Sequence, residues 1–430
     1  MTVYVRAAFR VVCLIVVMSI LSPAQASAGN AVTRWIERAL QTVRDVNIGT
    51  PNAGRLYAMV GVAIYDAVNG IDTADGETRA HALVAPAGAP AAASREAAAI
   101  AAAHAVLSSA APASYKTAVL DPARDAELAA LGASDPLVVA GANWGASVGT
   151  QVVSLRAADG TQAAQNMPAG TAAGKHRALF DSRFRNMTPF AIADKSRYAS
   201  DGPPAMTSAE YAEAYEDAKT FGRQDFDAER NEISQFWIAE ANTTREPGTW
   251  PQAALAIVEQ EGTVHSISDT ARLFALMTMA VADAVAVVWD SKAYFYSWRP
   301  TVAIREGHAD DNPLTVGDPT WTSRSGSVGS SPEYNSGTSS FAGAAAEVVE
   351  RFYCNQQIAF SFTTDKAPNG PRWYSSVLDA AREAGRSRVY QGIHFQFSNI
   401  DGRRVGTLIG REVVTTRLLR AGEVPSCGLQ

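Results

Sequence analysis

Helix-forming segments dominate the chain, and stretches of alternating β-branched and polar residues are too short to predict a sheet. We therefore predict an all-α fold. Serine and threonine stand before several segments as N-caps, among them Ser94, Ser268 and either Thr207 or Ser208, and Gly222 can end a helix. The predicted helices cover residues 55–69, 96–108, 125–132, 137–157, 208–221, 269–298, 339–353, 373–385 and 402–420. The sequence has no recognisable repeat of fixed period, and antiparallel helices of this kind usually pair as bundles.

Composition limits the number of domains and the kinds of partner. The chain has 430 residues, of which 47% are hydrophobic and 19% are charged, so it can bury a sizeable core in two or three domains or in one large helical assembly. Its net charge of −6 argues against nucleic acid or an anionic membrane surface as a partner, because both require a basic face. Any basic cluster should therefore be local and functional.

The first 28 residues are typical of a secretory signal peptide. Arg6 and Arg10 precede an apolar stretch at 11–21, and small residues follow up to Ala28. A retained membrane anchor is the alternative, but the apolar stretch is too short to span a bilayer. We expect a secreted or periplasmic protein without a membrane anchor, whose mature chain, 29–430, is one helical domain with its motifs between 270 and 410.

Two cysteines remain in the predicted mature chain, Cys354 and Cys427. An exported protein meets an oxidising environment, so these two could form a disulfide that holds the C-terminal tail. Two unpaired buried thiols are the alternative. No Cys-x-x-Cys pattern indicates a metal or redox site.

A first candidate binding segment runs from Lys292 to Pro300 and contains Arg299. Seven residues make two helical turns less about twenty degrees, so the two cations should lie on one face of a helix that Pro300 ends. A solvated basic stripe is the alternative. Aromatic residues crowd this segment, however, and they favour burial of both cations beside an anion.

A second candidate segment is Ser336-Gly337-Thr338, directly before a predicted helix. Glycine allows the backbone to approach a ligand closely, and the first N–H groups of a helix attract anions. Taken alone, the segment could equally be an ordinary N-cap.

The third segment contains Arg388, Gly392 and His394. On one continuous helix the arginine and the histidine would point to different sides, so we predict that Gly392 breaks the helix and turns both inward. A lone histidine among apolar neighbours is usually a core residue. Three cations, free N–H groups and one imidazole together, however, predict a pocket for a tetrahedral oxyanion such as phosphate or vanadate.

These segments resemble the three-part signature shared by vanadium-dependent haloperoxidases and type 2 phosphatidic acid phosphatases. The matching elements are Lys-x6-Arg-Pro at 292–300, Ser-Gly at 336–337 and Ser-Arg-x3-Gly-x-His at 387–394. Trp289, Pro332-Glu333-Tyr334 and the early Ala-Ile-Tyr-Asp-Ala-Val at 63–68 make the chain similar to the soluble, secreted haloperoxidases in particular.

The resemblance implies two packed helical bundles with the anion at their junction. It implies that His394 bonds the vanadium of vanadate, or attacks phosphorus. It also implies that Trp289 lies in the halide or substrate environment and that hydrogen peroxide and a halide are the reactants. The residues that would hold the anion's oxygen atoms are Lys292, Arg299, Ser336, Gly337 and Arg388.

The chain departs from the family pattern at three positions. Thr338 replaces the histidine that serves the family as acid–base group, and a hydroxyl cannot shuttle protons near neutral pH. Asn335 stands where proline is frequent, and Ser398 stands where an aspartate often orients the histidine. Asn399 or Asp401 could replace that aspartate, and His308 is the histidine nearest to the first motif in sequence.

Three interpretations follow from this pattern. The first is a vanadate-dependent haloperoxidase with weakened halide oxidation. The second is a secreted phosphate-ester hydrolase that works through phospho-His394 and accepts good leaving groups. The third is an anion-binding homologue without redox or hydrolytic turnover.

Overall fold

The computed structural model describes residues 29–224, 227–260, 266–423 and 427, so the predicted signal peptide lies outside the described residues. The α-helices are α1 (Ala31–Val46), α2 (Thr50–Ala74), α3 (Arg95–Ala110), α4 (Ala113–Tyr115), α5 (Asp121–Ala130), α6 (Pro136–Leu155), α7 (Ala209–Phe221), α8 (Ala228–Phe236), α9 (Arg245–Gln260), α10 (Ile267–Phe295), α11 (Pro300–Arg305), α12 (Gly337–Tyr353), α13 (Val377–Tyr390) and α14 (Gln396–Thr416). The strands are β1 (Asn166–Met167), β2 (Phe180–Asp181), β3 (Phe360–Phe362) and β4 (Arg372–Tyr374).

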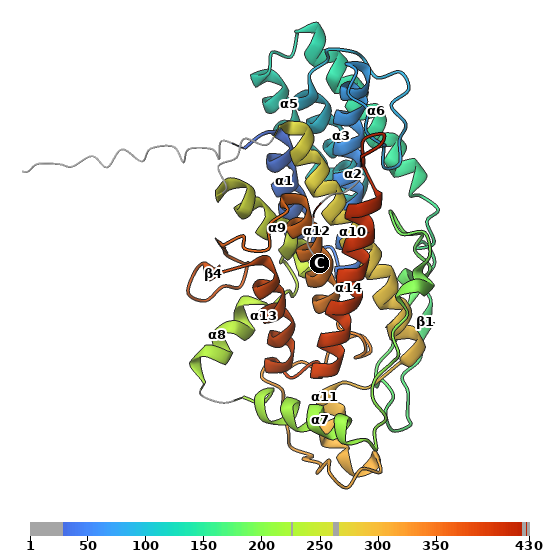
Figure 1. Ribbon diagram of the computed structural model, residues 1–430, viewed down its shortest axis with the longest axis vertical. Helices are drawn as coiled ribbons and strands as arrows, with labels where there is room; N and C mark the ends of the chain where they lie inside the picture. The colour runs from blue at the N-terminus through green and yellow to red at the C-terminus, as the bar shows by residue number, and fades with distance from the viewer. Residues whose placement is uncertain (1–28, 225–226, 261–265, 424–426, 428–430) are drawn as a thin grey trace, which may run out of the picture.

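Two helical bundles build the molecule, which confirms the predicted all-α fold. Helices α1, α2, α3 and α6 form the first bundle, and α9, α10, α12, α13 and α14 form the second. Figure 1 shows the first bundle in the upper part and the second below it, with α7 and α11 at the lower end. The four strands form two small antiparallel sheets, β1 with β2 and β3 with β4.

Helices α2 and α10 pack against each other and join the two bundles. Helix α10 is long and apolar enough to cross a membrane, but 94% of its most apolar window is buried inside the protein. Every residue from Leu273 to Trp289 is buried. The apolar run therefore serves as a core helix, as its flanking charges indicate.

Glycines on one face of α6 and of α14 allow unusually close helix packing. Three glycines of α6 lie against the backbone of α3, and three of α14 lie against that of α12. In both helices these glycines are four residues apart, which places them on one face. The pairs are Gly141 with Ser94, Gly145 with Ala98, Gly149 with Ala102, Gly402 with Ser336, Gly406 with Ser340, and Gly410 with Ala344.

The two central helices also carry equivalent buried carboxylates. Asp66 of α2 accepts hydrogen bonds from the backbone N–H groups of residues 82–84, and Asp283 of α10 accepts them from residues 190–192. Burial raises the pKa of each carboxyl to about 6. The packing thus repeats from one bundle to the other, although the sequence itself shows no repeat of fixed period.

Several helix boundaries differ from the predicted ones. The cap of α10 is Ser266 rather than Ser268, and α13 begins after Ser376 rather than near residue 373. Ser94 and Ser208 cap α3 and α7 as predicted. Helices α1, α8 and α9 were not predicted, because their mixed composition hides the helical pattern.

The two cysteines of the predicted mature chain lie together as free thiols. Cys354 follows α12, and a hydrogen bond with Cys427 raises the pKa of the Cys354 thiol. The structure therefore brings the pair together without the bond, and the disulfide stays a prediction.

Candidate functional site

A cavity of about 540 Å³ collects most of the residues that the sequence singles out. It lies between the C-terminal end of α10, the N-terminal end of α12 and the segment that joins α13 to α14. The predicted site residues that line it are Trp289, Lys292, Arg299, Gly337, Thr338, Arg388 and His394. Segments about a hundred residues apart in sequence thus converge on one place.

Lys292 and Arg299 both lie in this cavity, but they belong to two different helices rather than to one, as was predicted. Helix α10 ends at Phe295, because Tyr296 adopts a left-handed conformation with φ 51°. Arg299 is the N-cap of α11, and Pro300 is the first residue of that helix rather than the end of the preceding one. Proline suits this position because the first N–H of a helix has no intrahelical acceptor. The prediction that one helix carries both cations is therefore wrong, but their shared location is correct.

Both side chains are buried and held by backbone carbonyl groups. The Lys292 ammonium donates to the carbonyl oxygens of Pro332, at 2.5 Å, and Glu333, at 3.1 Å. The Arg299 guanidinium donates to the carbonyl oxygens of Ser331, at 2.8 Å, and Ile393, at 2.7 Å. These bonds fix the positions of two positive charges without neutralising them.

The N-terminus of α12 forms one wall of the cavity. Gly337 and Thr338 line it, and the backbone N–H groups in the first turn of a helix have no intrahelical acceptor. Ser336, by contrast, is not among the lining residues. It accepts a hydrogen bond from the Ser339 N–H and caps the helix, as in the alternative interpretation of this segment.

The segment between α13 and α14 supplies Arg388 and His394. Gly392 has φ 73° after the end of α13, and this break turns both side chains into the cavity, as predicted. Arg388 donates to the Gln391 side chain at 2.9 Å and lies 3.9 Å from a carboxylate oxygen of Glu246. Its Nε atom is buried and has no hydrogen-bond partner, so this guanidinium has capacity for a further acceptor.

Glu333 is the carboxylate that contacts the histidine. Its Oε1 atom lies 2.8 Å from His394 Nδ1. The two residues proposed from sequence are engaged elsewhere: Asn399 accepts from Ser339, and Asp401 accepts from Ser200 and Tyr334. The expectation for Asn399 and Asp401 is therefore wrong, because the carboxylate comes from a segment 61 positions earlier.

Burial shifts the pKa values of the ionisable groups in the site. It lowers the pKa of Lys292 and of His394 well below their ordinary values, and neighbouring cations, Arg299 first among them, lower both further. Burial also lowers the pKa of Arg299, to about 10. The pKa of Glu333 is raised to about 7 by burial, against the opposing effect of Arg299. His394 is therefore a neutral imidazole beside a concentration of positive charge.

Several residues of the cavity carry no signal in the sequence motifs. Glu246 lines the cavity from the first turn of α9 and accepts a hydrogen bond from Thr50 at 2.7 Å. Phe341 supplies aromatic surface in addition to the predicted Trp289. Only the three-dimensional packing of α2 and α9 brings Thr50 and Glu246 here, so motif spacing could not have found them.

No second histidine lines the described part of this cavity. His308 is exposed in a short turn after α11, away from the lining residues. His176 is buried against Tyr296, and burial lowers its pKa to about 4. The described residues also contain no cluster of three or more His, Cys, Asp or Glu side chains that could hold a metal cation. The buried side chains of Lys292, Arg299 and Arg388 suit an anion.

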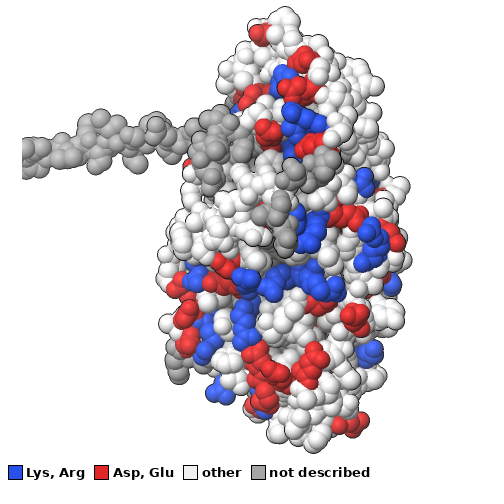
Figure 2. Space-filling view, viewed as in Figure 1, with Lys and Arg blue, Asp and Glu red and all other residues white. Residues whose placement is uncertain are grey.

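Several surface arginines are paired with carboxylates. Figure 2 shows Lys and Arg side chains in a band across the middle of one face. Arginines of α13 and α14 pair with nearby carboxylates: Arg382 with Asp379, Arg404 with Asp401, and Arg411 with Glu347.

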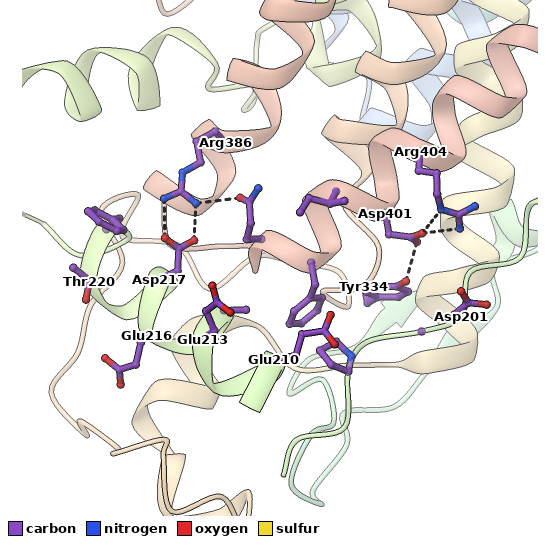
Figure 3. Close-up of a pocket in the computed structure, with 17 residues that line it drawn as sticks. Asp201, Glu210, Glu213, Glu216, Asp217, Thr220, Tyr334, Arg386, Asp401 and Arg404 are labelled. Atoms are coloured by element: carbon purple, nitrogen blue, oxygen red, sulfur yellow. Dashed lines mark hydrogen bonds and ion pairs between the residues drawn. The ribbon is translucent and has the colours of Figure 1, made fainter. Parts of the chain in front are cut away.

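A larger cavity, of about 1020 Å³, lies between α7 and the start of α14 and shares no lining residue with the candidate site. Figure 3 shows carboxylates of α7 around it, including Glu210 and Glu213, and the Asp217–Arg386 ion pair. Its acidic lining would repel the oxyanion that the first cavity suits.

Comparisons with known proteins agree with this arrangement. Residues 272–420 match the family model described as the VCPO second helical-bundle domain, and this range contains all the predicted site residues. A vanadium chloroperoxidase from Curvularia inaequalis is 35% identical over 95 residues, which cover 20% of this chain and 15% of that relative.

Solved structures with the same fold match nearly the whole chain. The crystal structure of a bacterial vanadium-dependent iodoperoxidase aligns with a TM-score of 0.73 and 22% identity, over 92% of this chain and 98% of that chain. A holo-type bacterial vanadium-dependent chloroperoxidase aligns with a TM-score of 0.70 and 15% identity, over 90% of this chain and 97% of that chain. At these identities the alignments establish the shared fold.

Proposed function

Because residues 272–420 match a vanadium chloroperoxidase family model and the whole fold resembles that of vanadium-dependent haloperoxidases, we propose that the chain is a vanadate-dependent enzyme that oxidises a halide with hydrogen peroxide. The observation that carries the proposal is the His394 imidazole in one cavity with the buried side chains of Lys292, Arg299 and Arg388.

The residues present fit a vanadate or phosphate dianion. Lys292, Arg299 and Arg388 are each at most 8% exposed, and the carboxylates near them are Glu333 and Glu246. Arg245 and Glu240 also line the cavity and offset each other, so the site retains one net positive charge when all seven groups are ionised. The unpartnered Arg388 Nε atom and the first N–H groups of α12 can donate to anion oxygens.

Bound vanadate would supply the activation of hydrogen peroxide towards a halide. The protein's own groups would then orient the anion and stabilise its negative charge. His394 offers its Nε2 lone pair, while the three cations compensate negative charge that a low-dielectric site could not otherwise accept. Trp289 and Phe341 form the aromatic wall that we assign to the halide or organic substrate.

Thr338 limits the rate of this chemistry. Its hydroxyl can donate a hydrogen bond to the anion, but it cannot act as acid and base near neutral pH. A missing acid–base group slows a step that needs proton transfer by roughly a hundred- to ten-thousand-fold. We therefore propose weak halide oxidation.

Phosphate-ester hydrolysis is the second candidate, and the form of His394 favours it. An unprotonated Nε2 can attack phosphorus while the P–O bond to the leaving group breaks, and water then releases phosphate from the histidine. Because Thr338 cannot protonate the leaving oxygen, we expect aryl or acyl phosphates to react and alkyl phosphates to remain unchanged.

Calorimetric titration with orthovanadate tests the site. Native protein should bind one equivalent, and His394→Ala should abolish binding, whereas His308→Ala, which alters an exposed histidine outside the cavity, should bind normally. Vanadate affinity that survives His394→Ala contradicts the assignment.

Bromination of a dye by bromide and peroxide then tests the activity. We expect slow turnover in the vanadate-loaded native protein and faster turnover in Thr338→His, since an imidazole restores proton transfer. Binding without bromination, together with cleavage of aryl phosphates, favours the second candidate. Binding with neither reaction favours the anion-binding homologue without turnover.

A further inference from the structure

The imidazole of His394 is held at both nitrogen atoms, and this determines which nitrogen carries the proton. Nε2 lies 2.9 Å from Nη1 of Arg299. A guanidinium has donors only, so Nε2 must accept. The proton of the neutral ring is therefore on Nδ1, which lies 2.8 Å from Glu333 Oε1 and donates to it. The ring thus keeps its lone pair on the nitrogen that faces the cavity cations.

The Glu333 carboxylate is itself fixed in place. Its Oε1 atom also accepts the backbone N–H of Phe395 at 3.0 Å, and the side chain is 1% exposed. The hydroxyl of Ser398, at the position where the family often has aspartate, lies 3.4 Å from Nδ1. The contact from Glu333 is the shorter of the two.

We propose that Glu333 is a positioning residue that holds His394 in the Nδ1–H form, in place of the carboxylate that the family carries at the position of Ser398. The proposal rests on the proposed function in one respect: the lone pair at Nε2 matters because the central atom of the anion would bond there. Histidines that bind metals usually donate their other N–H to a carboxylate or carbonyl group, which orients the ring and increases its basicity.

Two substitutions of Glu333 distinguish the effect of its hydrogen-bond acceptor from the effect of its negative charge. In Glu333→Gln the Phe395 N–H still requires an acceptor, so the amide oxygen should take the place of Oε1 and continue to accept from Nδ1. Glu333→Met has similar length but no acceptor. Both remove the negative charge, so any difference between them reports on the hydrogen bond alone.

Nitrogen-15 NMR of histidine-labelled protein, without vanadate, reads the protonation site directly. Spectra of His394→Ala identify the resonances. We expect one form, with the proton on Nδ1, in native protein and in Glu333→Gln. In Glu333→Met the buried Nδ1–H loses its acceptor, and because an unpaired buried donor costs free energy that opposes the Arg299 contact, we expect a mixture of forms. Ser398→Ala is the matched control and should keep the native spectrum, since its hydroxyl is the more distant contact.

Orthovanadate titration of the same four proteins gives the second measurement. We expect about 10- to 100-fold weaker binding in Glu333→Met, as is typical when such an orienting partner is removed, and affinity close to native in Glu333→Gln and Ser398→Ala. Thermal unfolding checks that each variant is folded. If Glu333→Met does not fold, Glu333→Gln still tests the proposal. Loss of the Nδ1–H form in Glu333→Gln overturns it.

The outcomes distinguish this proposal from the proposed function. A folded Glu333→Met that keeps either the single Nδ1–H form or the native affinity overturns the role of Glu333. Equal loss of affinity in Glu333→Gln and Glu333→Met overturns it too, because charge would then be the cause. If native protein shows the Nδ1–H form but binds no vanadate, the proposed function fails and the positioning by Glu333 stands.

Discussion

Gly402→Ala should disturb the candidate site through packing alone. A Cβ atom at Gly402 would lie 2.6 Å from the backbone oxygen of Ser336, whereas ordinary contacts begin at 3.4 Å. Helices α14 and α12 must therefore separate by about 0.8 Å at this point. Ser336 is the N-cap of α12, so the displacement passes directly to Gly337 and Thr338 in the cavity wall.

The magnitude follows from two opposing effects on stability and one on binding. Overpacking costs about 1–3 kcal/mol, and replacing glycine by alanine within a helix returns about 1 kcal/mol, so the net loss of unfolding free energy should be roughly 0–2 kcal/mol. A misplacement of about 1 Å can lower activity by up to about a hundredfold, so vanadate affinity should fall by about tenfold or more.

The first bundle supplies a matched control. Gly141 packs against Ser94, the N-cap of α3, and a Cβ atom there would lie closer still to the backbone oxygen. Gly141→Ala should therefore lose at least as much stability in urea unfolding while it keeps native vanadate affinity by calorimetry. Native affinity in a folded Gly402→Ala, or equal loss of affinity in both variants, would refute the reasoning.

Two further predictions concern a buried cation and a buried carboxylate. Arg388→Met should weaken vanadate binding by roughly 10- to 100-fold in calorimetry, because hydrogen bonds to charged groups contribute about 1.5–3 kcal/mol. The control is Arg386→Met, which alters an arginine on the same helix that is paired with Asp217 and should bind vanadate normally. Equal effects of the two substitutions contradict the assignment. Burial raises the pKa of Asp283 from 3.8 to about 6, so the folded protein binds this proton more tightly than the unfolded chain does. The stability that this carboxyl contributes is therefore fully present below pH 3.8 and is lost as the pH rises through 6. Relative to Asp283→Asn, native protein should lose roughly 2 kcal/mol of unfolding free energy between pH 4 and 7 in urea unfolding, and parallel pH profiles contradict this.

The sequence predicts the helices and the site better than it predicts the connections. Composition and serine caps suffice for α3 and α7, since these signals are local. The end of α10 was missed because the left-handed conformation of Tyr296 has no strong sequence signal, and Pro300 suits the start of a helix as well as the residue after one.

The contacts around His394 were predicted least well. Motif spacing brings Arg388 and His394 together through Gly392, which is a local effect. The Glu333 carboxylate and the Glu246 carboxylate reach the site from other segments, and their positions depend on how whole helices pack. The repeat between the bundles escaped detection because it consists of a few glycines and one aspartate among unrelated residues.

The pairing of α2 with α10 makes the protein comparable to a symmetric dimer joined within one chain. Corresponding helices of the two bundles meet at this contact, as subunits do in an isologous interface. Obligate dimers often have no stable folded monomer. A fragment limited to the second bundle would expose the apolar surface of α10 that α2 covers and would lose Thr50 from the cavity wall, so we expect the second bundle to depend on the first for both its folding and its site.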